Sequence, residues 1–150
     1  MKIETKYAGK VEINPQNIIR FDNGIPSFEE EKEFILLPFS DNPTPFYILQ
    51  STNTEGLAFV VMTPFNFFPD YEAKLTDSVQ EQLEIKDTTD VAIFVMLTLR
   101  DTLEDSTANL GGPIVINSKK QKGKQIVITD KDYHTKHPLA VPAATGQKEG

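Results

Sequence analysis

The nine-residue run VAIFVMLTL, residues 91 to 99, is the feature that most restricts how this chain folds. Apolar side chains occupy both alternating sets of positions, with Val91, Ile93, Val95 and Leu97 on one and Ala92, Phe94 and Met96 on the other. Because successive side chains of a strand point to opposite faces, the run predicts a strand that is buried, or nearly so, on both faces.

Short segments rich in β-branched and aromatic residues recur along the chain, separated by Pro, Gly, Asn and Asp. We expect strands near residues 2–7, 17–21, 33–38, 45–51, 57–63, 91–99, 113–117 and 124–129. The pattern predicts a mainly β fold, an antiparallel β-barrel-like or sandwich structure. A chain of 150 residues fits one domain, which we place at 1–139, followed by a flexible C-terminal tail at 140–150.

One short helix is expected at about residues 77–85, in the stretch DSVQEQLEI. The candidates for its N-terminal cap and capping box are Asp77, Ser78, Gln80 and Glu81. Val79 and Leu83 form an apolar pair at positions i and i+4, which predicts that the helix packs on the sheet.

A β-hairpin is expected between PIVIN at 113–117 and KQIVIT at 124–129, because isoleucine alternates with valine in both segments. The connection, SKKQKG, is polar and charged, which is typical of a solvent-exposed turn.

The composition excludes several classes of protein. Without cysteine, the chain has no disulfide scaffold, no thiolate metal site and no cysteine nucleophile. The N-terminal stretch has no apolar run like that of a signal peptide, and no segment approaches the roughly 20 apolar residues that span a bilayer, so we expect a cytoplasmic protein. A formal net charge of -7 argues against direct nucleic-acid binding and favours a basic protein partner.

Candidate catalytic and metal-binding residues are sparse. His134 and His137, with Asp130 and Asp132, offer ligands for a divalent cation, but their spacing matches no established metal pattern and is typical of a solvated turn. Ser51 lacks the flanking glycines of a nucleophile elbow. We therefore expect no enzyme activity, no metal and no cofactor.

The stretch TANLGGPI places paired glycines before a strand. Adjacent backbone N–H groups in such a loop can form an anion-binding nest, but the stretch lacks the Lys-Ser/Thr of a P-loop and leads into a strand instead of a helix. We expect Gly111 and Gly112 to supply a positive φ or a close approach in a tight turn.

Two clusters of like charge are interpreted as solvated surface. Four lysines lie between residues 119 and 124, without interleaved aromatic residues on which RNA bases would stack. The acidic run comprises Glu29, Glu30, Glu31 and Glu33 and adds to a negative field.

The stretch FNFFPDYE, which begins at Phe65, places three phenylalanine rings at a bend. Pro64 and Pro69 bracket the rings, so no regular strand or helix runs through the whole segment. We expect Phe65 and one other ring to fill the core, and the remainder to line a groove for an apolar helix. Asp70 and Glu72 would lie beside it to pair with Lys or Arg on the partner.

Five stretches stand out when they are considered together: FDNGIPSFEE (21–30), YILQS (47–51), LAFVVMTPFNFFPDYE (57–72), TANLGGPIVIN (107–117) and GKQIVI (123–128). Together they resemble the FliW family of flagellar assembly factors from about residue 2 to residue 139, and FPDYE and NLGGPIVIN are the most specific pieces. The family's early turn usually reads Gly-x-x-Gly-Phe, whereas here Ser27 replaces the second glycine, so we expect an ordinary φ at Ser27.

The resemblance implies a non-enzymatic binding protein with a β-barrel-like fold. Proteins similar to this family bind the translational repressor CsrA, a small basic RNA-binding dimer, and remove it from flagellin messenger RNA. They also bind flagellin, so that secretion of flagellin frees them to capture CsrA and restart flagellin translation. The alternative is a flagellin-binding chaperone without CsrA antagonism.

The acid-flanked aromatic bend and the resemblance together predict a partner-docking edge. Its expected residues are Phe67, Phe68, Pro69, Asp70, Tyr71 and Glu72, with Asn109 and Leu110 on an adjoining loop. Pro69 is expected to form the bend.

Overall fold

The computed structural model describes residues 1–41, 44–102, 105–128 and 133–139. The fold is mainly β with one α-helix among these residues, as predicted. The strands are β1 (Lys2–Thr5), β2 (Gly9–Glu12), β3 (Ile19–Arg20), β4 (Glu33–Pro38), β5 (Phe46–Ser51), β6 (Ala58–Met62), β7 (Val91–Thr98), β8 (Thr107–Ala108), β9 (Ile114–Asn117), β10 (Lys122–Gln125) and β11 (His137–Pro138). The helices are α1 (Asp77–Gln82) and the 3-10 turns η1 (Pro15–Asn17), η2 (Pro64–Asn66) and η3 (Thr88–Asp90). The expected tail at 140–150 lies outside the described residues.

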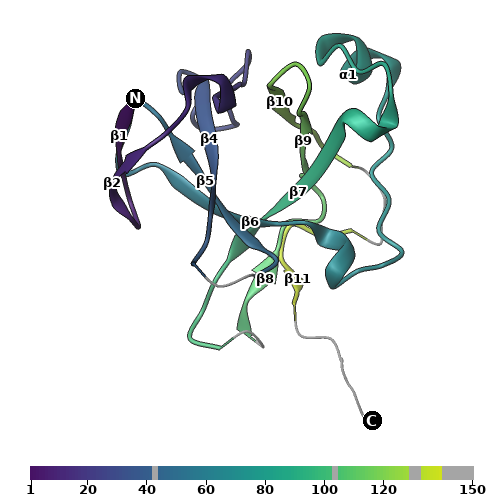
Figure 1. Ribbon diagram of the computed structural model, residues 1–150. Helices are drawn as coiled ribbons and strands as arrows, with labels where there is room; N and C mark the ends of the chain where they lie inside the picture. Colours follow the sequence, from purple (N-terminus) through teal and green to yellow (C-terminus); the bar gives the residue numbers. More distant parts are fainter. Residues whose placement is uncertain (42–43, 103–104, 129–132, 140–150) are drawn as a thin grey trace.

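Seven strands close into a barrel (Figure 1). Neighbouring strands follow the order β7, β6, β5, β4, β3, β10 and β9, and β9 pairs back onto the first half of β7. The barrel pairings are antiparallel except for β3 with β10, where Lys122 lies opposite Arg20 in a parallel pair. β8 and β11 extend the sheet beyond the far end of β7. Closure gives each of these seven strands a partner on both sides, so among the described residues the barrel itself has no free edge strand.

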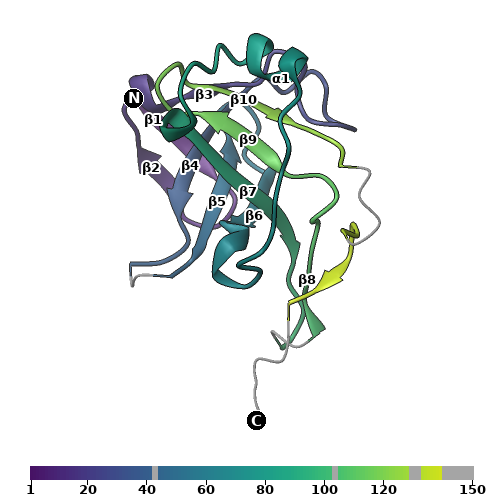
Figure 2. The same cartoon turned by 90° about the vertical axis from the view of Figure 1, so that its right-hand side faces the viewer.

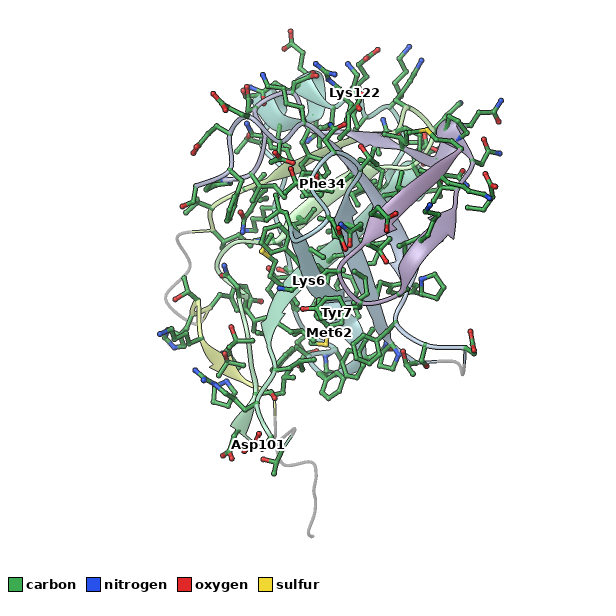
Figure 3. All side chains as sticks on the ribbon, turned by 90° about the vertical axis from the view of Figure 1, so that its left-hand side faces the viewer. Lys6, Tyr7, Phe34, Met62, Asp101 and Lys122 are labelled. Carbon is green, nitrogen blue, oxygen red and sulfur yellow. The ribbon has the colours of Figure 1, made fainter. Side chains whose placement is uncertain are left out.

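Apolar side chains from the barrel strands and the chain after β3 fill the interior. The buried members are Ile19, Phe21, Ile25, Phe34, Leu49, Val61, Phe94, Ile114 and Ile116. Phe21 and Phe34 meet edge to face with ring centroids 5.3 Å apart, and Figure 3 shows Phe34 inside the molecule. β10 passes close to these rings at Gly123, where an added Cβ would lie 2.6 Å from Phe21 Cζ, so glycine is required there.

β7 carries apolar contacts on both faces, as the run at 91–99 predicts. Ala92, Phe94 and Met96 pack in the barrel interior. Ile93, Val95 and Leu97 face outward and pack in an outer cluster with Met62 and Tyr71. The strand is therefore shared by two cores, which is why its sequence shows no polar face.

The N-terminal strand predicted at 2–7 ends earlier, at Thr5, and pairs with β2, a strand that the sequence did not predict. The hairpin packs Ile3 and Ile13 against Ile35 on the outer side of β4. The β2 stretch GKVE has a single apolar residue, so it lacks the alternation on which strand prediction depends.

α1 ends at Gln82, three residues before the predicted end, and its N-cap is Thr76, not Asp77 or Ser78. Thr76 Oγ1 accepts a hydrogen bond from the backbone N–H of Val79 at 3.2 Å. Since Val79 then occupies the position where a capping box needs Glu or Gln, the predicted capping box is wrong. The apolar side of the helix packs on β9, as predicted. Within the described parts of the chain, no helix is long and apolar enough to cross a membrane.

The predicted hairpin forms with a different second strand. β9 pairs with KGKQ rather than with KQIVIT, and Lys122 lies opposite Asn117. The turn closes early because Asn117 Oδ1 accepts the backbone N–H groups of Lys119 and Lys120 at 3.0 and 3.2 Å. The apolar run therefore continues past the end of β10, and the Val127 side chain is 81% exposed.

Ser27 has φ +75°, so the expectation of an ordinary φ is wrong. Phe28 N donates to Ile25 O at 2.6 Å and closes a four-residue turn with Pro26 in second place. Proline in second place and a positive φ in third place are features of a type II turn, which favours glycine at the third residue. Ser27 therefore adopts, at an energetic cost, a backbone conformation that favours glycine.

Replacing Ser27 by Gly is expected to raise the free energy of unfolding by about 0.5–1 kcal/mol, because a side chain in the left-handed region costs about 1–2 kcal/mol and glycine entropy offsets part of this. Urea unfolding followed by circular dichroism checks the value. Ser27→Ala keeps the Cβ atom and is the control, with no stabilisation expected. A Gly variant no more stable than the Ala variant would show that the turn carries no such strain.

Candidate functional site

The aromatic bend follows β6 and leads along the outside of the barrel to α1 (Figure 2). It begins with η2, whose first carbonyl, Pro64 O, accepts the N–H groups of Phe67 and Phe68 at 3.1 and 2.8 Å. The Phe65 side chain is 45% exposed, so the prediction that Phe65 fills the core is wrong. Pro64 takes the buried position of this turn, which directs Phe65 outward.

Phe67 and Phe68 are half-buried at the edge of the outer cluster. The Phe67 ring stacks on Phe46 with centroids 6.4 Å apart, and the Phe68 ring meets His137 edge to face at 5.0 Å. Each ring therefore packs against the barrel with part of its surface and leaves the remainder to solvent.

Tyr71 anchors the bend to the barrel. Its side chain is buried, and its hydroxyl donates a hydrogen bond to the carbonyl of Leu110 at 2.7 Å. Burial raises the pKa of Tyr71 far above its ordinary value, and the nearby Tyr133 raises it further, so the hydroxyl remains a donor at neutral pH. Tyr71 and Leu110 therefore hold the site together but offer a partner almost no side-chain surface.

The other predicted contact residues lie around this anchor. Pro69, Asp70 and Glu72 are exposed, and Asn109 is half-buried next to Leu110. The bond between Tyr71 and Leu110 brings the bend and the 109–110 loop together. Of the predicted contact residues in the bend, those whose side chains a partner can reach are Phe67, Phe68, Pro69, Asp70 and Glu72.

The glycine loop binds a carbonyl of the chain itself. The N–H groups of Leu110 and Gly111 donate to His134 O at 2.9 and 3.2 Å, so they are not free for an anion. Neither Gly111 nor Gly112 has a positive φ, and that part of the expectation is wrong. The close approach occurs at Gly112, where an added Cβ would lie 3.0 Å from Asn109 Nδ2.

The histidines considered as metal ligands stack on each other. The rings of His134 and His137 are 5.8 Å apart, and desolvation lowers the pKa of His137, with a smaller contribution from His134. Asp130 and Asp132 lie outside the described residues. Among the residues that are described, no three potential metal ligands gather at one point.

Ser51 has a structural role in the turn after β5. Its Oγ donates to Glu31 Oε1 at 2.6 Å and accepts the N–H groups of Asn53 and Thr54 at 3.2 and 3.0 Å. Glu31 therefore departs from the interpretation of the acidic run as purely solvated, because its carboxylate fixes this turn.

The lysine cluster is exposed at Lys119 and Lys120, as expected, but Lys122 forms an ion pair with Glu84 at 2.6 Å. The hydrogen bond and charge of Lys122 lower the pKa of Glu84, and Glu84 raises the pKa of Lys122. This pair joins β10 to the chain after α1.

An apolar groove that the sequence did not reveal lies beside the bend. Its volume is about 420 Å³. Its apolar walls are formed by Phe65, Ala73, Leu75, Ile85, Val91 and Ile93. These residues come from η2, from both sides of α1 and from β7, so only the folded chain brings them together.

Comparison with known proteins gives one consistent family. The model of the family described as "FliW protein" matches residues 2–139. "Flagellar assembly factor FliW" of Geobacillus kaustophilus is 54% identical over 139 residues, which cover 93% of this chain and 95% of that protein. The protein of the same name from Bacillus subtilis is 47% identical over 139 residues, with 93% and 96% covered. A solved structure, "Crystal structure of the flagellar assembly factor FliW", matches with a TM-score of 0.87 at 52% identity and covers 93% of this chain and 96% of that one.

Proposed function

The chain belongs to the FliW family of flagellar assembly factors, and on this premise we propose that it is a protein antagonist of the translational repressor CsrA that also binds flagellin. In this role it is a cytoplasmic binding protein, not an enzyme, and it needs no cofactor. Export of flagellin frees the protein to capture CsrA, which relieves repression of flagellin messenger RNA. The family relationship over residues 2–139 is the observation that carries the proposal.

The charge of the chain supports a basic partner. A formal net charge of -7 attracts a basic dimer and raises the rate of encounter at low ionic strength. Once bound, the same negative field lowers the affinity of the repressor for RNA phosphates. Competition for the same contacts is therefore unnecessary.

The size of the effect follows from linkage. A coupling free energy of about 1–3 kcal/mol between the RNA site and the protein site lowers RNA affinity about 5- to 150-fold. Reciprocity requires that RNA weaken the binding of this protein to CsrA by the same factor.

The partner-docking edge in this proposal consists of the reachable part of the bend. Phe67 and Phe68 supply half-exposed aromatic surface, and Asp70 and Glu72 supply exposed carboxylates. Tyr71 positions them through its buried hydrogen bond, so alanine at Tyr71 tests folding and not contact.

Neutralising the two carboxylates of the bend, Asp70→Asn with Glu72→Gln, is expected to weaken CsrA binding about tenfold, because two charge-assisted contacts with Lys or Arg are lost. Isothermal titration calorimetry with purified CsrA checks the change. The matched control neutralises Glu30 and Glu55, which are exposed and, within the described residues, form no ion pair. Equal losses for both pairs would mean that net charge, and not the bend, governs binding.

The test of the proposed function is a titration into a preformed complex of CsrA with labelled flagellin leader RNA. We expect the protein to release the RNA and added flagellin to reverse the release. Absence of release, together with absence of CsrA binding, would overturn the antagonist proposal. Binding of flagellin alone would then support the alternative, a flagellin-binding chaperone.

A further inference from the structure

The apolar groove beside the bend is open to a protein partner. Phe65 forms one wall with 45% of its side chain exposed, and η3 contributes the exposed Thr88 on another side. Gln80, the other polar residue at the groove, is committed to the chain because its Nε2 donates to Leu75 O at 2.9 Å. The groove thus offers mainly apolar contact, with few polar groups to orient a small polar ligand.

The chain around the groove carries most of the net charge of the protein. Residues 70–90 contain seven acidic residues and two lysines, a net charge of -5, against -7 for the whole chain. Asp70, Glu72, Asp77 and Glu81 are exposed, and within the described residues none of these four forms an ion pair. Lys74 and Lys86 lie in the same segment, but the net charge of the segment remains negative.

An apolar groove surrounded by acidic residues is complementary to a partner surface that is apolar at its centre and basic around it. Its occupant needs an apolar side chain that enters the groove and Lys or Arg beside it that reach the carboxylates. A second copy of this chain would bring the same acidic segment against itself, which like-charge repulsion disfavours.

We propose that this groove is where the basic repressor docks, by inserting an apolar side chain that is flanked by Lys or Arg. The inference rests on the proposed function, since it assigns the CsrA contact to a defined part of the surface. The buried apolar contact supplies affinity at the centre, and the charges around it supply the rate and the selection of a basic partner. The bend is then one edge of a larger surface that continues along the groove to η3.

Two substitutions test the groove without changing its buried walls. Phe65→Ala removes the exposed wall, and Thr88→Trp fills the groove from its rim. Each is expected to weaken CsrA binding about tenfold or more, because loss of a central apolar contact typically costs over 1 kcal/mol. The matched control is Phe39→Ala, since Phe39 is 41% exposed but does not line the groove.

Calorimetric titrations of each variant with CsrA and, separately, with flagellin distinguish the outcomes. The proposal requires that both groove variants bind CsrA more weakly than the original chain. Their affinity for flagellin, and the affinity of the Phe39 variant for CsrA, should stay within about twofold of the values for the original chain. Unchanged CsrA binding by both groove variants, beside measurable binding by the original chain, would overturn the groove but leave the proposed function standing. Weakened flagellin binding, or a change in self-association by sedimentation, would assign the groove to another occupant. No CsrA binding by the original chain would instead overturn the proposed function itself.

Discussion

Replacing Gln50 by Glu is expected to lower the free energy of unfolding at neutral pH by about 3 kcal/mol. Gln50 is fully buried, and its Oε1 accepts the backbone N–H of Lys6 at 3.0 Å. Its Nε2 faces four carbonyl oxygens at 3.0 to 3.3 Å, those of Ser51, Thr54, Glu55 and Leu57. A carboxylate would place a negative oxygen where this donor stands, in a site without solvent.

The destabilisation by the Glu variant should depend on pH. Burial among carbonyls raises the folded-state pKa of the new carboxyl above its unfolded value of about 4.3. The penalty of ionisation is therefore absent below about pH 4.3 and grows as pH rises towards the folded-state pKa. Urea unfolding between about pH 5 and about pH 8 should show the gap to the original chain widening with pH.

The control for charge is Gln50→Met, which removes the hydrogen bonds and adds no titratable group. We expect it to destabilise by about 2 kcal/mol, with the pH dependence of the original chain. If the free energies of unfolding of the Glu and Met variants showed the same pH dependence, the position of the Gln50 Nε2 group would not be buried among carbonyls. The site matters for the whole fold because it joins the β1–β2 hairpin to the turn between β5 and β6.

Replacing Asn117 by Ala is expected to lower the free energy of unfolding by about 2–4 kcal/mol. Asn117 is buried, and its Nδ2 donates to Leu83 O at 2.8 Å and Glu84 O at 3.2 Å, just after α1. Its Oδ1 closes the β9–β10 turn by accepting the N–H groups of Lys119 and Lys120. One side chain thus forms hydrogen bonds with two carbonyls and two N–H groups, and alanine removes all four hydrogen bonds.

The neighbouring residue provides a matched control for this prediction. Ser118 is exposed, and its Oγ donates to Asp90 O at 3.1 Å, so Ser118→Ala should cost less than about 1 kcal/mol. Chemical unfolding gives both values. Hydrogen exchange at the amides of Lys119 and Lys120 should accelerate only in the Asn117 variant. Similar losses for the two variants would show that Asn117 does not join the helix to the turn.

Local sequence patterns predicted the parts of the fold that depend on nearest neighbours. The doubly apolar run at 91–99 identified β7, and the apolar pair Val79 and Leu83 identified the buried side of α1. The details were missed where one polar side chain decided them. Thr76 and not Asp77 or Ser78 caps the helix, and Asn117 closes the turn so that β10 begins at Lys122, two residues before the predicted strand.

The candidate site was predicted in part. The FPDYE stretch does lie on the surface beside the 109–110 loop, but Tyr71 within it is buried, because a carbonyl at Leu110 offers Tyr71 a partner that no local pattern reveals. Phe65, three residues before this stretch, is exposed because Pro64 takes the buried position of η2. The prediction that the bend binds a partner remains to be tested by the variants above.

By itself, the sequence determined the β-rich class, the acidic charge and the family, because alternation, composition and family motifs are properties of the linear chain. Only the tertiary structure decided that β9 returns to β7 to close the barrel, and that Phe65, Ile85 and Ile93 line one groove. These features depend on contacts between residues far apart in the chain. Such contacts are selected by the packing of the whole core and not by the preferences of any one segment.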